Sequence, residues 1–319
     1  MRWREGKRAP RGMIRWIDAV VDGNTVYAMH GGTSKIYSYD STNDSWSQLP
    51  DCVHPNGSLA IINGWLTSIG GNLEPGSDAI NELFSLQHTR EGSDSRWTKK
   101  FPPMPTKRRR SIAQCIGTTL IVAGGEGEMY DVVSTVEVMD TETHQWSTAA
   151  DLPELTYLGS AAVCGDQLYV LTGLNHLGAT SKSVYACSVS ALLQSCVPIV
   201  SSAEAAASFK TGTSLEDKDV GVWRQVADLP VTHSTCESFH SRLLAIGGEM
   251  DSGEPSTAVH IYNSTTNSWE IISHMTTGRR DCFTASVLPD NQLMVVGGMT
   301  GRYGSAITDT VEVANTIDV

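Results

Sequence analysis

An apolar run that ends in two adjacent glycines occurs four times in this chain, at Gly70–Gly71, Gly124–Gly125, Gly247–Gly248 and Gly297–Gly298. Looser copies end at Gly31–Gly32 and at Gly173. After five of these six sites a polar turn leads to a tryptophan, at Trp46, Trp97, Trp146, Trp223 and Trp269. Repeats of about 50 residues are typical of β-propellers, in which each repeat is one blade. The repeat therefore constrains the fold strongly and the function weakly.

The repeat around Gly124 predicts that each unit is a four-stranded blade. Residues 111–116 and 119–123 form two largely apolar strands, as expected of strands that are covered on both faces. The glycines allow positive φ and the close approach of another segment. Residues 136–139 alternate as a third strand, and Trp146 opens a fourth after a polar turn. The pattern contains no helix, so we expect an all-β fold of antiparallel strands.

The last turn of the repeat has a constant length. An acidic or amide residue precedes the tryptophan by six positions in three repeats, at Asp40 and Trp46, Asp140 and Trp146, and Asn263 and Trp269. A large ring at a fixed place in every repeat fits a plug between neighbouring sheets, since one blade cannot bury its faces alone. The glycine doublet and the spaced tryptophan resemble the kelch repeat, and the resemblance covers the whole chain. Thr172, in the first glycine position of the fourth repeat, departs from that pattern.

The two ends of the chain complete each other in this pattern. Residues 311–315 align with residues 136–140, and the matching tryptophan would fall at position 321, beyond the last residue. The segment that begins at Trp3 looks like a fourth strand with no first three before it. We therefore predict one domain over residues 1–319, a six-bladed β-propeller of four antiparallel strands per blade. The N-terminal strand would close the ring in the last blade and leave no open sheet edge.

One segment breaks the repeat spacing. Residues 195–221 are surplus to the fourth blade and rich in small and polar side chains. Such a segment cannot bury enough apolar surface to fold by itself. We predict a disordered insert between the third and fourth strands of blade 4, at the rim.

Composition limits the surroundings in which the chain works. Hydrophobic residues make up 40% and charged residues 18%, which is ordinary for a soluble globular protein. No apolar run reaches the ~18 residues of a membrane span. The net charge of −12 argues against general nucleic-acid binding. The 7 cysteines include no Cys-x-x-Cys pair, which favours a reducing compartment. We expect a cytoplasmic or nuclear monomer that binds neither membranes nor nucleic acids.

Catalytic motifs are missing from the sequence. The glycine doublets lack the lysine and the following helix of a phosphate-binding loop, and neither a nucleophile elbow nor a His-Glu-x-x-His motif occurs. The best metal candidate combines His233, Cys236 and His240, but its spacing fits no tetrahedral site. Acidic residues gather in two loops, at Glu126, Glu128 and Asp131 and at Glu249, Asp251 and Glu254. They lack regular ligand spacing, so we predict no catalytic residue, metal or cofactor.

Positive charge is concentrated in three segments that lead into first strands. These segments hold fourteen of the 23 Lys and Arg residues: Arg2, Arg4, Lys7, Arg8, Arg11, Arg15, Lys99, Lys100, Lys107, Arg108, Arg109, Arg110, Arg279 and Arg280. We expect them around the mouth of the propeller axis, where guanidinium groups could hold an acidic segment of a partner. An arginine at this place also belongs to the kelch pattern, so a solvated loop or an import signal is the alternative. The predicted partner-binding residues are Arg11, Arg109, Arg110, Arg279, Arg280, Tyr130, Tyr157, His233 and Tyr303.

The resemblance implies a protein-interaction module whose face binds a segment of a partner. In kelch-like ubiquitin-ligase adaptors the propeller recruits the substrate, while separate BTB and BACK domains hold the cullin, and this chain has no room for those domains. Two alternatives remain open. One is a kelch-type enzyme that acts on a small polar substrate, and the other is an actin-associated scaffold.

Overall fold

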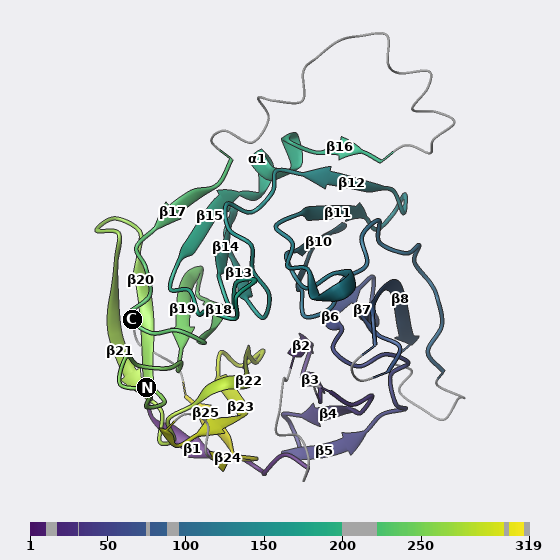
Figure 1. Ribbon diagram of the computed structural model, residues 1–319. Helices are drawn as coiled ribbons and strands as arrows, with labels where there is room; N and C mark the ends of the chain where they lie inside the picture. Colours follow the sequence, from purple (N-terminus) through teal and green to yellow (C-terminus); the bar gives the residue numbers. More distant parts are fainter. Residues whose placement is uncertain are drawn as a thin grey trace, which may run out of the picture.

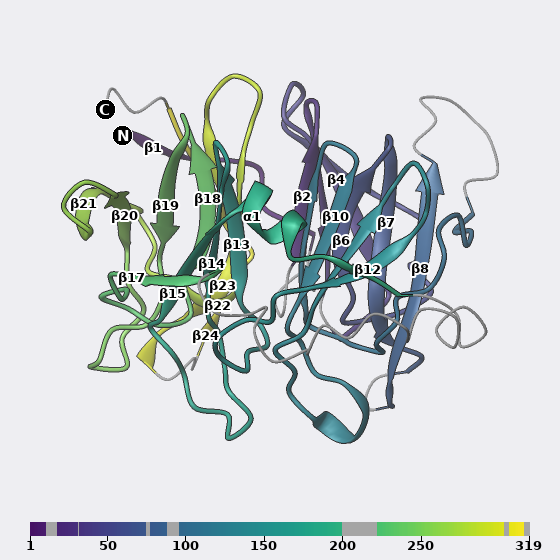
Figure 2. The ribbon, with the colours of Figure 1, turned by 90° about the horizontal axis from the view of Figure 1, so that it is seen from above.

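The computed structural model describes residues 1–10, 18–30, 32–74, 77–87, 96–199, 222–302 and 306–315. Within these ranges the strands form six sheets arranged as a ring around a central axis (Figure 1). Figure 2 shows the ring from its side as a disk whose strands run from one face to the other. The all-β, six-bladed propeller predicted from the sequence is confirmed.

The first three blades follow the chain order from the axis outwards. Blade 1 contains β2 (Asp18–Asp22), β3 (Thr25–Met29), β4 (Ile36–Asp40) and β5 (Ser45–Gln48). Blade 2 contains β6 (Ser58–Ile62), β7 (Trp65–Asn72) and β8 (Ala79–Gln87). Its fourth position is marked by a bridge between Ser85 and Thr98. Blade 3 contains β9 (Ile112–Ile116), β10 (Thr119–Ala123), β11 (Val136–Asp140) and β12 (Trp146–Ala149).

The other three blades repeat this order. Blade 4 contains β13 (Ser160–Cys164), β14 (Gln167–Leu171), β15 (Val184–Ser188) and β17 (Arg224–Val226). Blade 5 contains β18 (Thr235–Phe239), β19 (Arg242–Ile246), β20 (Ala258–Asn263) and β21 (Ser268–His274). Blade 6 contains β22 (Arg280–Val287), β23 (Leu293–Thr300), β25 (Val311–Ala314) and β1 (Trp3–Glu5), with the short β24 (Ala306–Ile307) beside β23.

The N-terminal strand closes the ring. β1 pairs antiparallel with β25, so that Trp3 lies opposite Ala314 and Glu5 opposite Glu312. Blade 6 thereby gains its fourth strand from the opposite end of the chain, which confirms the predicted closure.

The spaced tryptophans join each blade to the one before it. Five indole N–H groups donate to a backbone carbonyl in the segment that leaves the preceding blade: Trp46 to Lys7, Trp97 to Pro50, Trp146 to Pro102, Trp223 to Ala150 and Trp269 to Ala227. Trp3 makes the corresponding contact with the Ser273 hydroxyl of blade 5 at 3.0 Å. The apolar core lies between neighbouring sheets, as where Val138 of blade 3 packs in one cluster with Leu168 and Val170 of blade 4. The tryptophans are therefore the inter-blade plugs that their spacing predicts.

The glycine doublets are required where loops of two blades meet the end of a second strand. Gly124 and Gly125 have φ values of 62° and 102°. A Cβ on Gly124 would lie 2.5 Å from the Thr156 carbonyl oxygen of the next blade, and one on Gly125 would lie 2.8 Å from that of Arg109. Real Cβ atoms do not approach so closely, so larger residues would push the loops away from the axis.

The segment between the third and fourth strands of blade 4 is partly ordered. Helix α1 (Val189–Gln194) follows β15 directly, and Leu192 is fully buried. The two-residue strand β16 (Val197–Pro198) then pairs with β12, at the outer edge of blade 3 (Figure 1). Residues 195–199 are therefore not the start of a disordered insert, because they extend the sheet of the neighbouring blade. Residues 200–221 lie outside the described residues.

Two further observations concern the described part of the chain as a whole. None of its helices has the length and apolar character needed to cross a bilayer. Its six cysteines with described side chains are all free thiols: Cys52, Cys115, Cys164, Cys187, Cys196 and Cys236.

Candidate functional site at the mouth of the axial channel

One face of the disk is built from two sets of loops, and we call it the loop face. One set links second to third strands, and the other leads from each blade into the first strand of the next. Within a blade the two sets pair through backbone bridges, as between Arg109 and Glu126, Tyr157 and Leu174, and Thr232 and Glu249. The loop face lies along the lower edge of Figure 2.

Five residues with left-handed backbone conformation surround the axis on this face. Four of them stand two residues before a first strand and the fifth is the second residue of β22. We call them the mouth ring: Asn56, Arg110, Leu158, His233 and Asp281, with φ values of 60°, 51°, 56°, 54° and 41°. All five line one cavity of about 190 Å³ on the axis. Asn, His and Asp adopt positive φ more readily than other side chains, but it is uncommon for Arg110 and Leu158, and its recurrence around the axis is a reason to suspect function.

The backbone holds part of this ring together. The Arg110 N–H donates to the Asn56 carbonyl at 2.9 Å, and the Leu158 N–H donates to the Arg110 carbonyl at 3.0 Å. Consecutive blades thus present their ring residues at the same level, while the side chains differ in charge and polarity. The ring is a fixed frame with a variable chemical lining.

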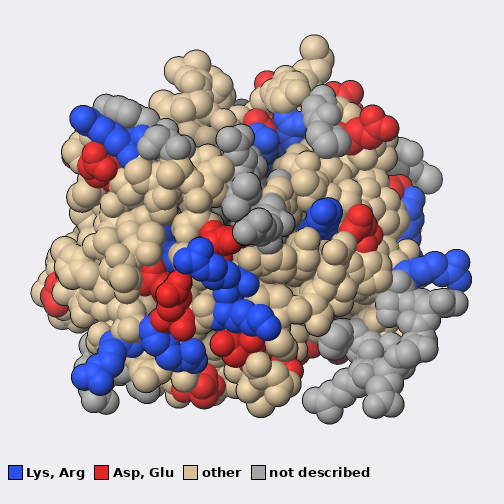
Figure 3. All heavy atoms as spheres, turned by 90° about the horizontal axis from the view of Figure 1, so that it is seen from below, with Lys and Arg blue, Asp and Glu red and all other residues tan. Residues whose placement is uncertain are grey.

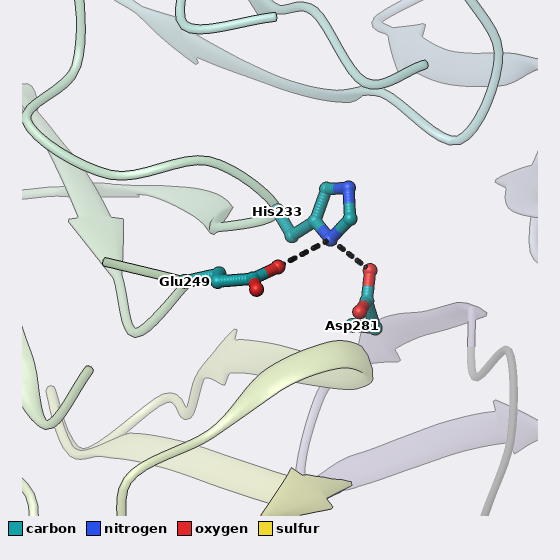
Figure 4. Close-up of side chains that lie close together, drawn as sticks. All are labelled: His233, Glu249 and Asp281. Atoms are coloured by element: carbon teal, nitrogen blue, oxygen red, sulfur yellow. Dashed lines mark ion pairs between the residues drawn. The ribbon is translucent and has the colours of Figure 1, made fainter. Parts of the chain in front are cut away.

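His233 lies between two carboxylates (Figure 4). Its Nδ1 is 3.7 Å from Glu249 Oε2 and 2.5 Å from Asp281 Oδ1. Among the described residues these three form the only group whose ligand atoms are close enough to share a metal ion. However, Arg280 pairs with Glu249 and also places its Nε 3.2 Å from Asp281 Oδ2. Because the guanidinium already compensates both carboxylates, the group fits an ion-pair network better than a metal centre.

The predicted arginines of blade 3 are held by one carboxylate. Glu126 Oε2 accepts from Arg109 Nε and from Arg110 Nη1, both at 3.0 Å. Arg109 is 4% exposed and stacks over the Tyr130 ring at 4.2 Å. Tyr157 is half-buried nearby, and burial together with the Glu126 charge raises its pKa. The structure therefore brings together Arg109, Arg110, Tyr130 and Tyr157.

Arg279 instead lies inside the protein. It is fully buried, its Nη2 is 2.8 Å from Glu312 Oε1, and its Nη1 donates to the Thr310 carbonyl at 3.1 Å. Although burial alone would raise the pKa of Glu312, the hydrogen bonds from Arg279 hold this pKa below its usual value. The prediction that Arg279 contacts a partner is wrong, because no part of its side chain reaches the surface.

Arg108 makes the same set of contacts in blade 3. Its Nη1 donates to the Gly124 and Thr135 carbonyls, its Nη2 to the Thr135 hydroxyl, and it pairs with Glu137 at 3.1 Å. Arg279 has the corresponding partners Gly297, Thr310 and Glu312. These two arginines are part of the repeat itself, where they fasten an entering loop to the glycine doublet.

The N-terminal cations do not lie at the mouth. Arg4 Nη2 donates to Gln292, and Arg8 pairs with Glu5 and with Asp309. Arg4 lies within β1 and Arg8 follows it. Because β1 is the outermost strand of blade 6, the predicted crowding at the axis is wrong for them. Figure 3 shows the side of the disk on which β1 lies, with positive and negative side chains intermingled across it. Arg11, Arg15 and Tyr303 lie outside the described residues.

Exposed apolar side chains project from the second-to-third-strand loops of four blades. We call them the apolar loop tips: Leu73 (62% exposed), Met129 (87%), Tyr130 (58%), Leu177 (79%) and Met250 (42%). The sequence reasoning identified only Tyr130. The signal for the others was available, since each is an apolar residue in an otherwise polar loop soon after a glycine site.

Comparison with known sequences places the repeat among kelch motifs. The Kelch motif profile matches residues 108–153 and 230–276. Kelch-like protein terF of Aspergillus terreus is 26% identical over 166 residues, which are 50% of this chain and 35% of that protein. Kelch-like protein 25 of Xenopus tropicalis is 20% identical over 256 residues, 76% of this chain and 37% of that protein. Human kelch-like protein 38 is 26% identical over 208 residues, 57% of this chain and 35% of that protein.

These relatives are longer than this chain, which spans about a third of the length of each of the three. Among solved structures, that of YjhT superposes with a TM-score of 0.72 at 17% identity, covering 97% of this chain and 99% of the other. At that identity the likeness shows the shared fold alone.

Proposed function

Because the chain is a kelch-repeat β-propeller related to the kelch-like proteins, we propose that it binds a segment of a partner protein on its loop face. The observation that carries the proposal is the set of apolar loop tips, which stand on the same face as the charged mouth ring. Soluble monomers rarely leave clustered large apolar side chains in water, and such clusters mark interaction sites.

The chemistry of the tips fits a protein partner. Met129 and Leu177 offer flexible apolar contact, and methionine adapts well to irregular surfaces. Tyr130 is held by its stacking on Arg109, so its ring loses little freedom on binding. Aromatic and methionine side chains are enriched at the centres of protein interfaces.

The charged residues at the mouth limit the chemical character of the expected partner segment. Arg110 and Arg280 are already paired with Glu126 and Glu249, so a purely acidic peptide would have to compete with these carboxylates. We propose an amphipathic segment whose apolar side chains cover the loop tips. An acidic side chain of the partner would then share Arg110, which is 25% exposed, and set the orientation of the segment.

The test compares two surfaces of the same protein. Met129→Ser combined with Leu177→Ser removes two loop tips, while Ile271→Ser removes an apolar side chain that is 56% exposed on β21 at the rim. The intact protein and both variants would be used to capture partners from a lysate of the cells that express it, with quantification by mass spectrometry. We expect a partner captured by the intact protein and by Ile271→Ser to be lost from the double variant. Equal capture by all three proteins would contradict a binding site on the loop face.

A further inference from the structure

The axial cavity continues inward from the mouth ring, and its inner wall carries two carboxyl groups. We propose that this cavity binds a small organic ammonium ion, with Glu237 as the anionic partner and Asp18 as the second acidic group of the wall. This site lies below the loop face and is independent of the protein-binding surface proposed above.

The two carboxyl groups lie at different depths. Asp18 is the first residue of β2 and pairs with Met29, the last residue of β3. Ile112 holds the equivalent position in blade 3, two residues after the ring residue Arg110. Glu237 lies on β18, four residues past the ring residue His233. At about 3.3 Å per residue, Asp18 is roughly 7 Å and Glu237 roughly 13 Å inside the mouth. A lysine of a partner lying on the face has too short a stem to reach Glu237, so a free amine is the better fit.

Polar side chains elsewhere on the wall form hydrogen bonds with the backbone of the neighbouring blade. First strands leave one edge unpaired toward the axis, and side chains of the adjacent blade satisfy it. Ser58 Oγ donates to the Ser111 carbonyl at 2.6 Å, and Asp18 Oδ2 accepts from the Leu59 N–H at 2.6 Å. Gln114 of blade 3 occupies the strand position that Glu237 occupies in blade 5, and its side-chain amide donates to the Ala161 carbonyl at 2.9 Å.

Glu237 differs from these residues. In the described part of the chain no hydrogen bond joins the Glu237 side chain to the neighbouring blade, whereas Gln114 donates to the Ala161 carbonyl. Among the described residues no cation lies within ion-pair distance of it, and burial raises its pKa to about 8 against the opposing effect of the Ser238 N–H. Burial likewise raises the pKa of Asp18 to about 6. A cation that entered the cavity would supply the missing compensation.

The other titratable groups that the structure describes around Glu237 do not supply it. Arg110 and His233 stand at the mouth and are engaged by Glu126 and Asp281. Cys236 on β18 and Cys164 on the adjacent β13 have pKa values raised by burial, so both remain neutral thiols. The inner cavity is therefore acidic.

An organic ammonium ion suits this wall better than a metal ion. The one described group of three potential metal ligands is the mouth cluster, so Glu237 and Asp18 do not share close ligand atoms with a third such residue. The remaining wall includes Ala19, Ala113, Phe283 and Ala285 beside the hydroxyl group of Thr235. A carboxylate with nearby apolar surface can hold an ammonium group and its alkyl stem together.

Binding of a cation must be coupled to loss of a proton. In the empty cavity at pH 7 Glu237 is largely protonated, whereas the bound ammonium ion favours the carboxylate. We therefore expect uptake of the ammonium ion to release up to one proton, and affinity to rise with pH until about pH 8.

The experiment is isothermal titration calorimetry of the full chain with propylammonium, 1-propanol and propionate. These probes share a three-carbon stem and differ in charge. Titration at pH 7 in two buffers of different ionisation enthalpy gives the number of protons released. We expect propylammonium alone to bind, with proton release. Glu237→Gln should weaken binding at least tenfold and abolish the proton release, while Glu270→Gln, on the exposed outer strand β21, should leave both unchanged.

Three results would overturn the proposal. They are no binding of propylammonium at millimolar concentration, equal or tighter binding of propionate or propanol, and unchanged binding by a folded Glu237→Gln variant. The probe selectivity and the sign of proton exchange are measured on the unmodified chain, so they decide the matter even if Glu237→Gln does not fold.

Discussion

Trp3 lies opposite Ala314 in the register that places Trp146 opposite Met139, so the start of the chain supplies the tryptophan of the sixth blade. Its indole N–H also reaches back to the preceding blade, at Ser273. Closure therefore restores both the strand and the inter-blade plug of the repeat.

Replacement of Trp3 by alanine should destabilise the protein by about 2–3 kcal/mol, because it removes a large ring packed between blades 5 and 6. Trp3→Phe keeps the ring and removes the donor to Ser273, so it should cost about 1 kcal/mol. Urea denaturation of the three proteins measures both effects. Equal midpoints for Trp3→Ala and the unmodified chain would mean that β1 contributes nothing to closure.

Arg279→Ala should destabilise the fold by about 3–5 kcal/mol, since it leaves Glu312 buried without its cation. Arg108→Ala should have a similar effect, because it leaves the buried Glu137 without its arginine partner. Arg242→Ala, at an exposed position of β19, serves as the control and should change stability by less than about 0.5 kcal/mol. Stability is measured by chemical denaturation at pH 7. A loss for Arg279→Ala no larger than that of the control would show that the buried pair is dispensable.

Glu237→Gln should change how stability depends on pH. The folded pKa of Glu237, about 8, lies above its ordinary value of 4.5, so between these values the folded state retains a proton that the unfolded state has lost. This group therefore lowers stability by about 1.4 kcal/mol for each pH unit as pH rises through that window, and its effect levels off above pH 8. The difference in unfolding free energy between the variant and the unmodified chain should grow in favour of the variant from pH 5 to pH 8. A constant difference would mean that Glu237 titrates normally.

Gly124→Ala should be strongly destabilising, by more than the ~1–2 kcal/mol that a left-handed alanine costs by itself. The added Cβ would meet the Thr156 carbonyl oxygen at 2.5 Å. Gly117→Ala is the matched control, since its φ of +57° is similar and nothing lies within 4 Å of the added Cβ. Thermal melting of the two variants separates backbone strain from collision. Equal melting temperatures would show that the loop of blade 4 can move aside.

The fold could be predicted because its signals repeat along the chain. The glycine sites and tryptophans recur in the same order in successive repeats, and each recurrence supports the others. The arginines show where such reasoning fails. Arg108 and Arg109 are neighbours in the sequence, but Arg108 points into the interior of blade 3 while Arg109 lies beneath Tyr130. A count of charges per loop cannot separate these orientations, which depend on partners far along the chain.

The mouth ring could not be predicted from the sequence for a different reason. Its members share a backbone conformation and a place at or just before the start of a first strand, but their side chains have no type in common, as Leu158 and Asp281 illustrate. The start of the insert was placed too early because β16 is only two residues long and depends on the exposed edge of β12 for its hydrogen bonds. In both cases the determining partner belongs to another blade.

The pairing of β1 with β25 has a consequence for synthesis of the chain. β1 is synthesised more than 300 residues before β25, the last strand of the described chain. Until then β1 has no partner, and blades already formed expose an apolar face where blade 6 will pack. The nascent chain must therefore protect this unfinished ring, and its final step joins residues of extreme sequence separation, which makes slow closure the expected bottleneck of folding.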